Sequence, residues 1–165
     1  MNRLFAIVSL ALLACGPIQA DTDPLQMVGE ARLKVMFWPV YDSRLYSPDG
    51  SYGDGQRPLR LDIQYLRDIE ADDLVTHTRK EWERLQVADA SQQPWLVMLG
   101  RMWPDVGEND VLSLVVDEQE RSTFLLNGEP LGEIADPEFG KNILGIWLSP
   151  DTSRPELRLS LLGIN

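Results

Sequence analysis

Hydrophobic and polar residues alternate along residues 29–50 in a pattern that predicts extended structure. One side of the strand is apolar and is predicted to face the core, with Ala31, Leu33, Val35 and Phe37. The other side combines two cations with a thioether and an indole, a mixture typical of a ligand cleft, with Arg32, Lys34, Met36 and Trp38. Pro39 cannot donate to a sheet hydrogen bond, so we expect the strand to bulge or break there before extended structure resumes at 40–46.

The rest of the chain switches between period two and helical periodicity. The predicted strands after the first region are residues 57–66, 111–117, 122–126 and 129–134. The predicted helices are residues 72–85, a segment that starts near Pro94 and ends by Pro104, residues 136–148 and residues 157–162. The order of the elements is strands, two helices, strands and two helices. This order predicts an α+β fold with an antiparallel sheet and helices packed on it.

The first 20 residues have the pattern of a secretory signal peptide. A short positive start is followed by the apolar run 4–14 and by small-residue cleavage after Ala20. We therefore expect a signal peptide at 1–20, one domain at 21–165, and a periplasmic or secreted protein. The alternative is a lipoprotein anchored through Cys15, which ends a loose lipobox. No other segment has the length of a membrane span.

Charge and residue types exclude several function classes. The chain has 15 Lys and Arg against 26 Asp and Glu, and removal of Arg3 leaves 14 against 26, a net charge of −12. Such an excess of acid argues against nucleic acid and anionic membranes as partners. His77 has no second histidine beside it, and no phosphate-binding loop, nucleophile elbow or metal-ligand cluster is present in the sequence. We therefore expect no cofactor and no metal.

Several stretches resemble the chalcone isomerase family, in particular its exported bacterial branch. They are residues 40–46 (VYDSRLY), residues 124–134 (FLLNGEPLGEI) and the segment 136–148 that ends in GIWL. The resemblance implies an open-faced β-sandwich, in which a large antiparallel sheet carries a layer of helices on one face. It also implies a ligand cleft between the sheet and those helices.

The resemblance implies a role for Arg32, which matches a cleft arginine that holds a phenolate in the plant enzymes and a carboxylate in fatty-acid-binding relatives. Lys34 is the alternative cation. The remaining predicted ligand contacts are Met36, Trp38 and Tyr41. Asp42 stands where the plant enzymes have a threonine that steadies a ketone, and an acid there argues against isomerase chemistry.

Three functions remain open at this point. The first is a non-catalytic protein that binds a small amphipathic acid, such as a fatty acid, with Arg32 as its anchor. The second is an intramolecular lyase or isomerase of the chalcone isomerase type. The third is a structural or interaction protein, marked by a filled cleft and by Arg32 paired to Glu30 or Asp42. The sequence names no protein partner.

Overall fold

The computed structural model describes residues 24–164 and contains one antiparallel sheet with four helices. Neighbouring strands pair in sequence order throughout the sheet. The strands are β1 (Gln26–Val35), β2 (Trp38–Ser47), β3 (Leu59–Tyr65), β4 (Val111–Val116), β5 (Ser122–Leu126) and β6 (Glu129–Ile134). The helices are α1 (Ala71–Arg84), α2 (Asp89–Met102), α3 (Pro137–Leu148) and α4 (Pro155–Leu161). The α+β fold and the antiparallel sheet are confirmed.

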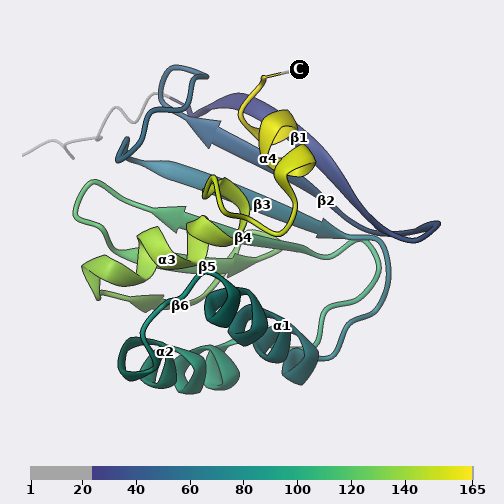
Figure 1. The fold of residues 1–165 in the computed structure, drawn as a ribbon, viewed down its shortest axis with the longest axis vertical. Coiled ribbons are helices and arrows are strands. Elements are labelled where there is room, and N and C mark those ends of the chain that lie inside the picture. The colour runs from purple at the N-terminus through teal and green to yellow at the C-terminus, as the bar shows by residue number, and fades with distance from the viewer. Residues whose placement is uncertain (1–23, 165) are drawn as a thin grey trace, which may run out of the picture.

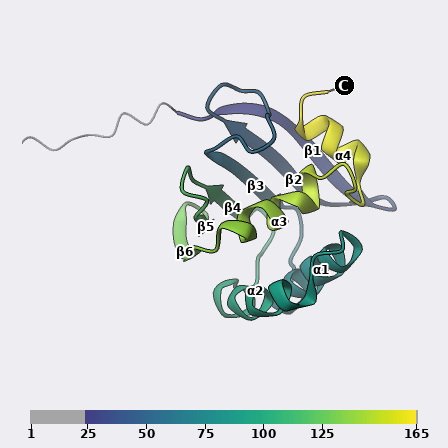
Figure 2. The same cartoon turned by 60° about the vertical axis from the view of Figure 1, so that its left-hand side comes forward.

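The helices lie over one face of the sheet, and the other face is left without a helical layer (Figures 1 and 2). An aromatic cluster joins the layers, because Phe139 of α3 packs edge-to-face against Trp82 of α1, Trp95 of α2 and Phe124 of β5. Edge-to-face pairs bring the positive edge of one ring to the negative face of the next, which favours this geometry over a stacked sandwich. Trp82 and Phe139 are completely buried, so this cluster is the centre of the core.

The first strand region differs from its prediction, because the chain reverses at Met36–Phe37 instead of continuing through Trp38. Val35 pairs with Trp38, Lys34 with Pro39, and Leu33 with Tyr41, which leaves Val40 as a bulge. The irregularity expected next to Pro39 is therefore confirmed, but it lies within the second strand of a tight hairpin. The turn needs a left-handed residue, and Met36 supplies it with φ of 57°. No Asn-Gly or Asp-Gly pair marks this turn, so the sequence carries no recognisable signal for it.

Two helix starts also differ from their predictions. α2 begins at Asp89, so Pro94 lies inside the helix and not in its first turn. The side chain of Gln92 donates to the Val87 carbonyl at 2.7 Å and so ties this earlier start to the preceding loop. α4 begins at Pro155, two residues before the predicted start at 157, and its N-cap Arg154 makes no side-chain capping hydrogen bond.

The start of α3 agrees with its prediction. Asp136 is the N-cap, and its Oδ1 accepts a 3.0 Å hydrogen bond from the backbone N–H of Glu138. The predicted signal peptide and Cys15 lie outside the described residues. Within residues 24–164, no helix has both the length and the apolar character needed to cross a membrane.

Candidate ligand-binding cavity

An apolar cavity of about 360 Å³ lies between the helix-covered face of the sheet and helices α1 and α3. Aliphatic and aromatic side chains from both layers form its wall, including Leu33, Ile63, Leu74, Leu112, Ile146 and Trp147. The inward positions of β1, β3 and β4 reach the cavity because alternate residues of a strand point to the same face. Its size lies near the lower end of the roughly 300–1,000 Å³ typical of small-molecule sites.

The hydroxyl of Tyr41 is one of the few polar groups in the wall of the cavity. It accepts a 3.0 Å hydrogen bond from the indole N–H of Trp147, which connects β2 to α3. Burial raises the pKa of Tyr41 to about 12, although the hydrogen bond from Trp147 and the charge of Arg154 act in the opposite direction. The phenol is therefore neutral at ordinary pH, and its own proton can be donated to a ligand.

Tyr65 is the second phenol of the wall. It lies on β3 directly opposite Tyr41, and the two rings meet edge-to-face with centroids 6.3 Å apart. Burial is the main cause that raises the pKa of Tyr65. Since Tyr65 lines the cavity, it brings a second neutral phenol to the wall.

Charged groups of the cavity wall come from α1. Asp73, His77 and Lys80 are spaced by four and three residues, so they lie along one stripe of the helix. All three side chains are exposed, which places them at the rim of the cavity. Lys80 makes no salt bridge with any described residue. An anionic ligand head at this rim would have a free ammonium group to bind.

Arg32 does not line the cavity. Its guanidinium makes two hydrogen bonds to the Asp42 carboxylate, with Nε 2.6 Å from Oδ1 and Nη2 2.7 Å from Oδ2. Both residues lie next to cavity-lining neighbours, Leu33 and Tyr41, and therefore point to the opposite, open face of the sheet. The pair lowers the pKa of Asp42 and raises that of Arg32.

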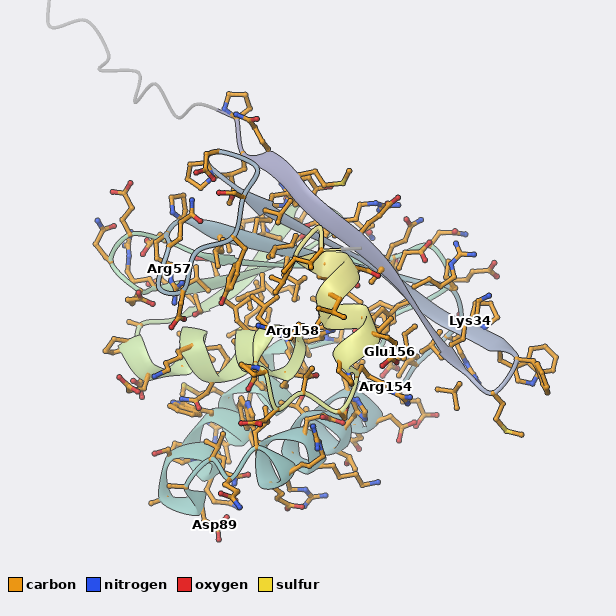
Figure 3. The ribbon with its side chains drawn as sticks, turned by 45° about the horizontal axis from the view of Figure 1, so that its top comes forward. Lys34, Arg57, Asp89, Arg154, Glu156 and Arg158 are labelled. Carbon is orange, nitrogen blue, oxygen red and sulfur yellow. The ribbon has the colours of Figure 1, made fainter. Side chains whose placement is uncertain are left out.

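Lys34, Met36 and Trp38 do not line the cavity either. They are exposed at the outer end of the β1–β2 hairpin, where Figure 3 shows Lys34 well away from the helices. Only Tyr41, of the five predicted contacts, lies in the wall. The cationic side of the first strand therefore does not face this cavity, because the helices cover the side of Leu33 and Tyr41.

The residues that sequence reasoning missed are those on α1, on β3 and on α3. The sequence pattern indicates that His77 is a partly exposed helix residue and that Lys80 lies on the polar side of the same helix. The pattern also indicates an inward position for Tyr65 on its strand, and it puts Trp147 on the apolar stripe of its helix. Strand alternation places Tyr65, and helical periodicity places Lys80 and Trp147, but neither pattern indicates that these three side chains meet around one cavity.

Comparison with known proteins establishes the family of this chain. The sequence model that defines the chalcone isomerase-like family matches residues 16–163, and the chain belongs to that family. An uncharacterized protein of Haemophilus influenzae is 33% identical over 138 residues, which cover 84% of this chain and 68% of the relative.

A solved structure supports the fold independently. The crystal structure of a fatty-acid binding protein of Arabidopsis thaliana superimposes with a TM-score of 0.67. The alignment covers 86% of this chain and 87% of the other, at 11% sequence identity. At that identity the likeness concerns the fold alone, and it agrees with the open sheet and single helical layer described above.

Proposed function

We propose that this protein is a non-catalytic binding protein that holds a small amphipathic acid, of the fatty-acid class, in the cavity between the sheet and helices α1 and α3. The observation that carries the proposal is the cavity itself, which is apolar, holds two neutral phenols and has a free lysine at its rim. An acyl chain fits such a wall because burial of each methylene contributes about 0.8 kcal/mol.

The head group of the ligand is assigned to the rim. Lys80 offers an ammonium group that has no salt-bridge partner among residues 24–164, and a charge-assisted hydrogen bond to a carboxylate is stronger than one between neutral groups. The family and the fold support this assignment, since the structurally similar Arabidopsis protein is named a fatty-acid binding protein. The anchor proposed here, however, is on α1 and not at Arg32.

The paired state of Arg32 matches one of the two marks of a purely structural protein. The other mark, a filled cleft, is not met, because about 360 Å³ is open between the sheet and the helices. The open cavity favours ligand binding over a purely structural role.

Calorimetric titration with a saturated medium-chain fatty acid tests the proposal. The protein is purified from cells that express the full-length chain, delipidated, and compared with Lys80→Met, Lys34→Met and Lys141→Met. These are the three lysines of the chain, and Lys34 and Lys141 do not line the cavity. We expect Lys80→Met to weaken binding about tenfold, as loss of one charge-assisted hydrogen bond implies, and the other two to leave it unchanged.

The methyl ester of the same acid is the matched ligand control. It keeps the acyl chain and loses the charge, so we expect it to bind wild type and Lys80→Met equally. Absence of binding by the wild type, or an equal loss in all three lysine variants, would contradict the proposal.

A further inference from the structure

The outer end of the β1–β2 hairpin exposes a contiguous group of large apolar side chains. Met36, Phe37 and Trp38 are 84%, 90% and 72% exposed, and Val35 at the base of this tip is 47% exposed. Other large exposed hydrophobic residues of the described chain, such as Val97 on α2 and Leu159 on α4, occur singly. Single exposed apolar residues are ordinary, whereas a contiguous group marks an interaction site.

The hairpin tip, defined here as residues 36–38, has no packing role within residues 24–164. None of its three side chains belongs to the core or to the partly buried residues that pack against it. The hairpin also projects past the neighbouring strands (Figures 1 and 3). Stability of the fold therefore does not explain why a methionine, a phenylalanine and a tryptophan occupy a turn in which small polar residues are usual.

The shape and size of the tip favour a lipid surface as its occupant. Three side chains expose on the order of 500 Å², less than the roughly 800 Å² that each partner of a stable protein complex contributes. The tip is convex, and a bilayer accepts a convex apolar group without a matching pocket. Tryptophan in particular is enriched where the acyl chains of a membrane meet its head groups.

The charges around the tip agree with docking on lipid. Near the outer end of the hairpin, Arg32 forms an ion pair with Asp42, so Lys34 is the cation left near the tip. A lysine side chain can reach from an inserted segment to the head-group phosphates. The whole chain carries a net charge of −11, and the groove behind Val40 is lined by four acids and one cation, namely Asp68, Glu70, Asp73, Asp105 and Arg67. Anionic lipid would repel this surface, so neutral lipid is the expected partner.

We propose that the hairpin tip docks the protein onto a neutral lipid surface by inserting Met36, Phe37 and Trp38 among the lipids. This inference is independent of the proposed ligand, because it rests on the exposure of the tip and does not require the cavity to be occupied. The docking site and the proposed ligand site are linked by position only, because the cavity is lined by Val35 and Val40, which lie on either side of the tip.

Quenching of tryptophan fluorescence by phosphatidylcholine vesicles with brominated acyl chains tests this site specifically. The chain has five tryptophans, and Trp82, Trp95 and Trp103 are buried whereas Trp38 is exposed. We expect quenching of the wild type and its loss in Trp38→Phe, because that variant keeps an apolar tip and removes the reporter. The quenching signal reports on residue 38. Lipid contact made by residues outside the described range does not produce this signal.

Removal of apolar surface provides the second variant. We expect Phe37→Ser to require about tenfold more lipid for half-maximal quenching, and the matched variant Leu159→Ser, which removes a singly exposed leucine, to behave as the wild type. No quenching of the folded wild type, or equal quenching in Trp38→Phe, overturns the proposal. Concentration-dependent dimers that disappear in Phe37→Ser, without any quenching, would assign the tip to a second copy of the chain instead.

Discussion

The indole N–H of Trp147 donates a 3.0 Å hydrogen bond to the hydroxyl of Tyr41 across the wall of the cavity. The two residues are 106 positions apart in the chain, and their contact joins the second strand to the helix that follows the last strand. Because the Tyr41 oxygen accepts this hydrogen bond, its own O–H can still donate to another acceptor. This phenol is therefore both a structural link and a candidate ligand contact.

Tyr41→Phe should reduce both stability and affinity. Loss of the hydroxyl leaves the indole N–H of Trp147 without its acceptor, which costs about 1 kcal/mol for a typical protein hydrogen bond. The free energy of unfolding from urea titration measures this cost. Tyr46→Phe is the matched control, since Tyr46 lies on the same strand and on the open face, over Arg60. Equal effects of the two substitutions would contradict the assigned role of Tyr41.

Stability should fall in alkali because two phenols are held neutral. Burial raises the pKa of Tyr41 from 10.0 to about 12, and that of Tyr65 is raised as well. In the unfolded chain both phenols lose their protons near pH 10, so above that pH the unfolded state binds fewer protons than the folded state. The free energy of unfolding should therefore be unaffected below about pH 10 and fall between about pH 10 and pH 12, by up to about 1.4 kcal/mol per pH unit for each phenol.

The double variant Tyr41→Phe/Tyr65→Phe isolates this effect. Its free energy of unfolding should decline less steeply over the same pH interval, since neither position can then titrate. An unchanged slope would mean that other groups cause the alkaline loss of stability.

Arg32→Ala should leave ligand affinity within about twofold of the wild type. The guanidinium is paired to Asp42 on the open face of the sheet and cannot reach an acid in the cavity without reversing the strand. The same calorimetric titration measures the effect, with Lys80→Met as the positive control. A loss of about tenfold or more on Arg32→Ala would restore the binding role that the sequence suggested for this arginine.

Gly29→Ala should detach α4 from the edge of the sheet. A Cβ at residue 29 would collide with the backbone carbonyls of Ser160 and Leu161, which cannot move without moving the helix. We expect a destabilisation of about 1–3 kcal/mol, typical of forced overpacking, and faster hydrogen exchange of the α4 amides. Gly100→Ala on α2 is the matched control, because nothing lies within 4 Å of its Cβ position. That control should be neutral or slightly stabilising, and equal losses for both variants would exclude the steric explanation.

Much of the fold could be predicted because local signals and tertiary packing agree. The alternation from Leu59 to Tyr65 predicted a half-buried strand, and all its inward residues are buried. The Asn127-Gly128 turn has the left-handed backbone that this pair favours, and Asp136 caps its helix as expected. Where the local signal was weak, as at Met36 and at the start of α2, boundaries were misplaced.

The site was harder to predict because periodicity groups residues by side without saying which side is covered. Alternation correctly separates Arg32 and Lys34 from Leu33 and Val35, but the amphipathic character of their side predicts a cleft there, and the cavity does not lie on that side. The cavity instead lies on the apolar side, where Tyr41 and Tyr65 supply the two phenol hydroxyls. Its charged rim comes from Lys80 on a helix that is distant in the sequence, and pairing across such a distance is not encoded in local pattern.

Blocking the cavity tests the central claim most directly. Thr76 is half-buried on α1 and lines the cavity, so Thr76→Trp fills the space at its rim, whereas Arg79→Trp adds the same side chain at an exposed position outside the wall. The measurement is the fatty-acid dissociation constant by calorimetry, with urea titration to show that both variants are folded. We predict that Thr76→Trp weakens binding at least about tenfold and that Arg79→Trp binds as the wild type does. Equal affinity of the two folded variants would show that the acid binds elsewhere and would contradict the account.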